Sequence, residues 1–321
     1  MAKPHFDLTT FGEIMLRLSV PAGTRLEQAQ GFAVHAGGAE ANMATALAYL
    51  GRRCAWHGAL PESPLGRLAT GGMRLAGVNL DSVIWQPDGR MGSYYVEFSA
   101  PPRPIQVVYD RADSCTARML PEQLNWPALF DTRLIHLTGI TPAISANCHE
   151  ITEQIVDRAR QAKIPYVLDI NYRAKLWSTE AAAAVLRPLA AGAAILLCSR
   201  ADAERVFGIR GEPQQVAEQL CAQLGAERAV VTIGAEGVVA WDGQQALREA
   251  ALPVQIIDRL GAGDALAAGV IHGFLDGDLG QGLRYGVALA ALALSQHGDA
   301  VVTTLAEVDR LASHAGTMIT R

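Results

Sequence analysis

Lysine is scarce in this sequence: only three of its 27 basic residues are lysines, and they do not cluster. The formal net charge is −5. A protein that holds the phosphate backbone of DNA or RNA needs a basic patch or stripe. The composition therefore argues against a nucleic-acid partner.

Long hydrophobic runs and paired cysteines are also missing. A membrane span needs roughly 20 apolar residues. The apolar stretch 181–197 is interrupted by Arg187 and Pro188, and the stretch 287–294 is too short. Residues 1–16 lack the apolar core of a secretory signal. The five cysteines are an odd, scattered set without C-x-x-C, which argues against disulfides or zinc. We expect a cytoplasmic protein with no membrane partner.

Short apolar runs alternate with stretches of helical periodicity from about residue 133 onward. This alternation is typical of parallel strands with helices on both faces of the sheet. The expected strands are 133–139, 165–171, 193–199 and 228–234, with earlier ones at 6–14 and 52–60. The expected helices are 38–50, 147–163, 179–191 and 214–224.

Two segments, about 16–35 and 92–111, interrupt this pattern. They alternate apolar and polar residues and lack helices, which predicts an antiparallel layer with one face open to solvent. The prolines of residues 99–104 predict the turn of a hairpin there. We expect one α/β domain, 1–321, with these segments as a small β-lid. Its uncovered face favours a homodimer or a higher homo-oligomer.

Residues 258–273, DRLGAGDALAAGVIHG, are the sharpest candidate for a chemical site. They follow the strand-like run 252–258, and the first turn of the expected helix holds residues 261–264. Free N–H groups at a helix start bind anions. A carboxylate repels phosphate, so Asp264 suggests a base that takes a proton from an attacking hydroxyl. The alternative is an ordinary turn in which Asp264 caps the helix.

Two other segments carry weaker signals. Gly37 and Gly38 precede an expected helix and allow a polyol to approach, and Asn42 offers hydrogen bonds to hydroxyls. Arg173, in DINYRAKLW after an expected strand, offers a bidentate anion contact. Taken alone, the first segment is equally well explained by an ordinary strand-to-helix turn, and Arg173 is more typical of a surface loop.

Two familiar phosphate-binding motifs are not satisfied. The sequence contains no G-x-x-x-x-G-K-[ST], and Leu266 stands where G-x-G-x-x-G needs its third glycine. A P-loop NTPase is excluded, and a nicotinamide-dependent dehydrogenase is a poor fit.

Taken together, these motifs resemble the ribokinase (PfkB) family of carbohydrate kinases. GGAEANMA, DINYR with LW, SRADAE, VVTIGAEGVV and D-x-x-G-A-G-D occur in the family's order over nearly the whole chain. GGAE, HLTGITPAIS, DINYRAKLWS and APPRPIQVVYDRADS are most similar to 2-keto-3-deoxygluconate kinases. The resemblance implies a three-layer ribokinase-like α/β fold with a mostly parallel central sheet and a small β-sheet lid. It also implies ATP and Mg²⁺.

The resemblance assigns Asp264 as the catalytic base. It assigns the backbone of Gly261, Ala262 and Gly263 as the anion hole for the γ-phosphate. The residues assigned to ATP are Asn171, Ser199, Thr232, Gly234, Ala235, Gly237, Gly261 and Gly263. Ser199 and Asp202 replace the family's Asn and Glu, so Asp202 is the candidate for a water-mediated Mg²⁺ contact. Arg259 replaces the usual Thr or Pro and leaves open whether a monovalent cation binds beside this loop.

On the acceptor side, the resemblance places eight residues around the substrate: Gly38, Asn42, Tyr94, Tyr109, Arg111, Arg173, Asp264 and Asp299. Arg111 and Arg173 fall near the carboxylate of a sugar acid. A planar guanidinium binds a carboxylate better than a neutral hydroxyl, so this pair favours acids over neutral sugars. Asp299, taken alone, is more typical of a solvated turn.

The resulting hypothesis is an ATP-dependent kinase for the terminal C6 hydroxyl of 2-keto-3-deoxygluconate or a close relative. The alternatives are a 5-dehydro-2-deoxygluconate kinase, a fructokinase-like enzyme and a non-catalytic sugar or nucleotide sensor on the same fold. The sequence leaves the gluco and galacto epimers as equal candidates.

Overall fold

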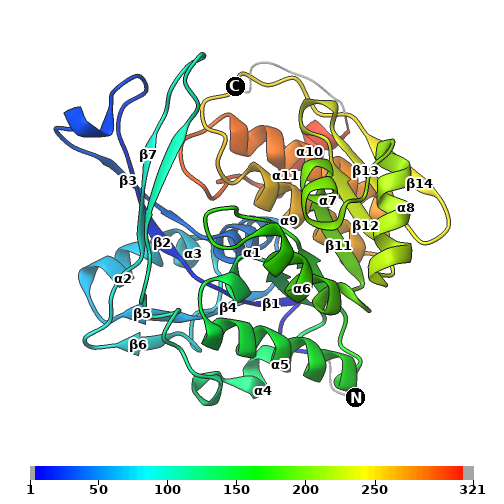
Figure 1. Cartoon of the computed structure of the whole chain (residues 1–321), viewed down its shortest axis with the longest axis horizontal. Helices are drawn as coiled ribbons and strands as arrows, with labels where there is room; N and C mark the ends of the chain where they lie inside the picture. The colour runs from blue at the N-terminus through cyan, green and yellow to red at the C-terminus, as the bar shows by residue number, and fades with distance from the viewer. Residues whose placement is uncertain (1–3, 314–321) are drawn as a thin grey trace.

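Eight strands form the central sheet, in the order β14-β13-β12-β11-β10-β9-β1-β4 (Figure 1). The structure is a computed structural model that describes residues 4–313. The six strands from β12 to β4 pair in parallel, and β13 and β14 are antiparallel at one edge. The strands are β1 Leu8–Phe11, β4 Cys54–His57, β9 Ile135–Thr138, β10 Tyr166–Asp169, β11 Ile195–Ser199, β12 Ala229–Thr232, β13 Val238–Trp241 and β14 Ala246–Glu249.

Helices cover both faces of this sheet, and alternate strand residues enter two separate cores. In β10, Val167 belongs to the core that contains residues of α1, α9 and α10, whereas Leu168 belongs to the core that contains residues of α5, α6 and α8. The helices are α1 Ala39–Tyr49, α2 Pro64–Ala69, α3 Gly71–Ala76, α4 Trp126–Phe130, α5 Ala146–Ala162, α6 Thr179–Ala190, α7 Arg200–Phe207, α8 Pro213–Leu224, α9 Ala262–Leu275, α10 Leu279–Leu294 and α11 Leu305–Ala312. Among residues 4–313, none of these helices combines the length and apolarity that a membrane crossing requires.

The three-layer fold expected from the sequence is confirmed, with small shifts at the ends of elements. The run 52–60 divides at Gly58 into β4 and β5 Ala59–Pro61. A Cβ at Gly58 would lie 2.6 Å from the carbonyl oxygen of Gly12, so only glycine fits between these two strands. β5 then pairs with β6 Ile84–Gln86 in a separate two-stranded sheet.

The strand expected at 252–258 is wrong. The β13–β14 hairpin closes its edge of the sheet, and the chain returns from there toward α9 without adding a strand. The N–H groups of Ile257 and Asp258 reach the carbonyl of Leu294 at the end of α10, at 2.8 and 3.3 Å. Ile256 and Ile257 are 43% and 47% exposed, so the β-branched residues that suggested a strand lie at the surface.

A second, four-stranded sheet, the small sheet, stands beside the main body, to the left in Figure 1. Its order is β3-β2-β7-β8, with β2 Met15–Ser19, β3 Ala33–Gly37, β7 Ser93–Glu97 and β8 Gln106–Asp110. The hairpin turn expected at 99–104 joins β7 to β8. The expectation of a wholly antiparallel layer is wrong, because β2 and β7 pair in parallel. A long crossover through α1 to α3 separates these two strands in the chain, as parallel pairing requires.

Glycines bring the backbones of α9 and α10 into contact. A Cβ at Gly269 would lie 2.3 Å from the backbone nitrogen of Gly286, and one at Gly273 would lie 2.3 Å from that of Gly282. This packing fixes the axis of α9, whose N-terminus carries the GAGD turn.

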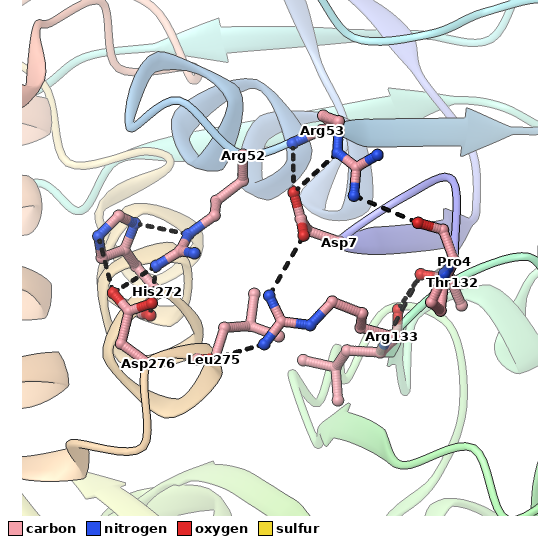
Figure 2. A network of polar contacts seen from close by, with 10 residues as sticks. Pro4, Asp7, Arg52, Arg53, Thr132, Arg133, His272, Leu275 and Asp276 are labelled. Atoms are coloured by element: carbon pink, nitrogen blue, oxygen red, sulfur yellow. Dashed lines mark hydrogen bonds and ion pairs between the residues drawn. The ribbon is translucent and has the colours of Figure 1, made fainter. Parts of the chain in front are cut away.

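An ionic network holds the opposite end of α9 (Figure 2). Arg52 donates to the carbonyl of His272 at 3.1 Å, and Arg133 donates to that of Leu275 at 2.8 Å. Arg133 also bonds Asp7, just before β1, at 3.2 Å. Cations are favourable at a helix C-terminus because they complement its dipole.

Replacing Gly269 by alanine tests the α9–α10 contact. We expect Gly269→Ala to lower the free energy of unfolding by about 1–3 kcal/mol, measured by urea denaturation, because the methyl group overlaps backbone atoms. The matched control is Gly72→Ala in α3, where an added Cβ meets nothing within 4 Å. That change is expected to be neutral or stabilising. Equal effects of the two substitutions would contradict the close packing.

Candidate active site

A cavity of about 300 Å³ lies where the small sheet meets the N-termini of α1 and α9. This volume is at the lower end of ligand pockets and suits a sugar-sized molecule rather than a nucleotide. All eight residues expected around the acceptor line this cavity: Gly38, Asn42, Tyr94, Tyr109, Arg111, Arg173, Asp264 and Asp299. Residues separated by more than 200 positions in the chain therefore share one site.

The N-termini of two helices meet at the cavity. Gly38 precedes α1 and Gly261 precedes α9. Asn42 joins them, because its amide nitrogen donates to Oδ2 of Asp264 at 2.8 Å and its oxygen accepts the N–H of Gly38 at 3.4 Å. Since both helix dipoles are positive at this end, the site favours an anion.

We expected Gly261 inside the first turn of α9, but it lies one residue before the helix. Its φ is +81°, and a Cβ there would lie 1.7 Å from the carbonyl oxygen of Asp299. Only glycine fits this position. The following N–H groups belong to the first turn of α9, where no carbonyl of the helix is available to them.

Asp264 bonds Asn42 rather than an N–H group of its own helix, so the capping alternative has no support in the structure. Burial raises the pKa of Asp264 from 3.8 to about 7, although the hydrogen bond from Asn42 and the charge of Arg173 act to lower it. A carboxyl with a pKa near neutrality is a stronger proton acceptor than an ordinary aspartate. The site therefore holds a group suited to general-base chemistry.

The two candidate carboxylate-binding arginines differ in their partners. Arg111 donates from Nε to Oε2 of Glu13 at 2.8 Å, and its Nη2 bonds the same oxygen. Arg173 is exposed, and the one hydrogen bond that its guanidinium makes to residues 4–313 runs from Nη1 to the carbonyl of Tyr172 at 3.2 Å. Arg173 is thus the cation of the cavity without a carboxylate partner among the described residues.

Asp299 is buried, with 8% of its surface exposed, so its assignment to a solvated turn is wrong. Its Oδ1 pairs with Arg17 at 2.6 Å, and its Oδ2 accepts the hydroxyl of Tyr94. The sequence singled out Asp299 but not Arg17 or Glu13. Both lie in the apolar run GEIMLRLS, where no local pattern shows their distant partners.

Two further carboxyl groups, the half-buried Asp169 and the buried Glu40, were not predicted from the sequence. Asp169 ends β10; burial and then the charge of Asp264 raise its pKa to about 8, while Arg173 acts to lower it. Glu40 lines the cavity and accepts the hydroxyls of Thr138 and Thr141 at 2.6 and 2.5 Å. Its place in GGAE was a usable signal.

Six of the eight residues expected to bind ATP lie at the carboxyl ends of the neighbouring parallel strands β10, β11 and β12, and the other two, Gly261 and Gly263, lie at the start of α9. Asn171 follows β10 with φ +40°, Ser199 ends β11, and Thr232 ends β12. Gly234, Ala235 and Gly237 form the turn to β13. Apart from Gly261, none of the residues expected to bind ATP lines the 300 Å³ cavity, so this surface is separate from the proposed acceptor pocket.

Ser199 caps α7, since its hydroxyl accepts the N–H of Asp202 at 3.0 Å. Within residues 4–313 there is no group of three or more His, Cys, Asp or Glu side chains placed to hold a metal. The described residues therefore fit Mg²⁺ only in the way that kinases usually bind it, through one or two carboxylates together with the phosphates of the nucleotide.

Known proteins similar to this chain point to one family. A model of the pfkB family of carbohydrate kinases matches residues 6–304. The 2-dehydro-3-deoxygalactonokinase of Haloferax volcanii is 36% identical over 306 residues, 95% of this chain and 96% of that protein. The 2-dehydro-3-deoxygluconokinase of Thermoproteus tenax is 30% identical, over 93% of this chain and 91% of that one. The crystal structure of 2-dehydro-3-deoxygluconokinase from Thermotoga maritima has a TM-score of 0.90 at 33% identity, covering 97% of this chain and all of that one.

Proposed function

Because the chain belongs to the pfkB family of carbohydrate kinases, we propose that it phosphorylates a six-carbon sugar acid at the C6 hydroxyl, with ATP as donor. The acceptor is 2-keto-3-deoxygluconate, also called 2-dehydro-3-deoxygluconate, or a close relative. One observation carries the proposal: Arg173 and Asp264 line the same small cavity, so a cation without a carboxylate partner and a candidate base face one ligand.

The relatives support an acid of this class. The Haloferax protein is named for the galacto epimer and the Thermotoga protein for the gluco epimer. Both substrates are 3-deoxy sugar acids with a carboxylate at one end and a hydroxyl at the other. A guanidinium and a base that line the same cavity suit such a molecule.

The proposed mechanism begins with Asp264. Its carboxylate takes the proton from the C6 hydroxyl, and the oxygen forms a bond to the γ-phosphorus as the bond from that phosphorus to the β–γ bridging oxygen breaks. The N–H groups after Gly261 stabilise the charge on the transferring phosphoryl group. ADP leaves with the electrons of the broken bond.

The small sheet supplies the acceptor side of this reaction. Tyr94 and Tyr109 are directly paired in β7 and β8, with ring centroids 5.8 Å apart, and both line the cavity. We propose that the small sheet acts as a lid that keeps water from competing with the sugar hydroxyl.

Mg²⁺ bound to the nucleotide would neutralise phosphate charge, and Asp202 is the candidate to contact it through water.

The other face of the small sheet favours the homodimer among the expected homo-oligomers. Val34, Leu18, Tyr95 and Val108 are neighbours in a row across its four strands, and Val34 and Val108 are 46% and 43% exposed. An apolar row of this kind is typically covered by a partner. We expect sedimentation velocity to show a dimer for the natural chain and a monomer for Val34→Asp. A monomeric natural chain would contradict this expectation.

Asp264→Asn tests the base. We expect kcat to fall about 100- to 10,000-fold, with ATP binding retained, because general-base catalysis contributes this much. Since only the carboxylate accepts a proton, kcat/KM of the natural chain should rise with pH and level off above about 7. Steady-state kinetics across pH measure both effects. Asp242→Asn, in the surface turn after β13, is the matched control and should keep kcat. Near-normal turnover of Asp264→Asn would refute its role.

A coupled ADP-release assay tests the acceptor, using 2-keto-3-deoxygluconate, its galacto epimer, fructose and ribose. We expect Arg173→Met to raise KM for the acids roughly 10- to 100-fold, the loss of one charged hydrogen bond, and to leave KM for neutral sugars unchanged. Arg118→Met, which changes an exposed arginine outside the cavity, is the control. Equal effects on acids and neutral sugars would refute Arg173 as the carboxylate partner.

A further inference from the structure

Arg17 of β2 is the most deeply buried cation among the described residues that border the site, with 1% of its surface exposed. It is not part of the cavity lining. Its Nη1 pairs with Asp299 at 2.6 Å, and its Nη2 pairs with Asp258. Its Nε donates to Ser19 at 2.8 Å, so all three guanidinium nitrogens have partners.

The two carboxylates belong to the two turns that shape the start of α9. Asp258 accepts the N–H of Leu260 at 3.0 Å and that of Gly298 at 3.3 Å, so it bonds both turns. The carbonyl oxygen of Asp299 lies against Gly261, within 1.7 Å of where a Cβ would be. A shift of either turn therefore moves Gly261 and the N–H groups that follow it.

The same cluster reaches the acceptor side. Arg17 and Tyr94 are directly paired in the small sheet, and the hydroxyl of Tyr94 donates to Asp299. Tyr94 lines the cavity. The guanidinium is thus the point at which the small sheet, the turn before α9 and the turn at Gly298 meet.

Charge and shape explain why arginine stands at position 17. Without a cation, Asp258 and Asp299 would be two buried carboxylates with no counter-ion, which is strongly unfavourable. A planar guanidinium presents two Nη groups in a fixed fork and bonds both carboxylates at once, whereas a lysine offers a single point charge. The cluster demands a defined geometry, not only a positive charge.

We propose that Arg17 is a positioning residue for phosphoryl transfer, which holds the turns at Asp258 and Asp299 so that the N–H groups after Gly261 stay aligned with the transferring phosphoryl group. The proposal rests on the function proposed above for the start of α9, and it is independent of which sugar is the acceptor.

The test compares Arg17→Lys with Arg133→Met, using the acceptor that the natural chain phosphorylates best. Arg133→Met removes an arginine from the ionic network at the other end of α9 (Figure 2), which has no contact with the cavity. For Arg17→Lys we expect kcat to fall about 100-fold, as misplacement of a reacting group does, while KM for ATP stays unchanged. For Arg133→Met we expect a lower melting temperature with kcat unchanged.

Rescue gives a second readout. In Arg17→Ala, millimolar guanidinium should raise kcat while the same concentration of sodium chloride does not, and Arg133→Ala should show no such response. Undiminished kcat in Arg17→Lys would overturn the proposal. It would also be overturned if, at both position 17 and position 133, kcat fell in proportion to the melting temperature. Activity of the natural chain on neutral sugars alone would refute the proposed acceptor. The comparison of Arg17→Lys with Arg133→Met would then be made with that neutral sugar and would still test the role of Arg17.

Discussion

The meeting of the N-termini of α1 and α9 decides where the rest of the site lies. The 2.8 Å hydrogen bond between Asn42 and Asp264 holds the two helices together at this point, and the glycine contact of Gly269 with α10 fixes the axis of α9. The same enclosure has two chemical effects. It concentrates backbone N–H groups on one side of the cavity, and it raises the pKa of Asp264 toward neutrality. The proposed anion binding and the proposed proton abstraction thus have one structural origin.

Charge pairing then sorts the arginines of the site into different roles. Arg17 and Arg111 are bound to carboxylates of the protein, so their charges stabilise the structure around the cavity. Arg173 has no ion pair among residues 4–313, and its charge remains available to a ligand. In a chain whose net charge is −5, an anionic acceptor needs such a local cation. In the proposed function, preference for an acid would therefore depend mainly on Arg173.

Local patterns predicted much of this structure from the sequence. Buried apolar runs such as 193–199 identified the parallel strands, and the glycines around Asp264 identified the start of α9. The alternation of apolar and polar residues in β2 and β7 predicts which side chains share a face of the sheet. It does not predict the relative direction of the two strands, since parallel and antiparallel strands show the same alternation. The β-branched residues at 254–257 have a high strand propensity, but propensity carries no information on whether a sheet edge is free to pair with them. The partners of Arg17 lie 241 and 282 positions away, and only the folded chain brings them together.

Analysis of the product tests the central claim most directly: that a sugar acid receives the phosphoryl group at the hydroxyl beside Asp264. The protein would be incubated with ATP, Mg²⁺ and 2-keto-3-deoxygluconate, and phosphorus–proton correlation NMR would locate the new phosphate. We expect coupling of phosphorus to the protons on C6. A phosphate on another carbon, or release of free phosphate without a sugar phosphate, would contradict it.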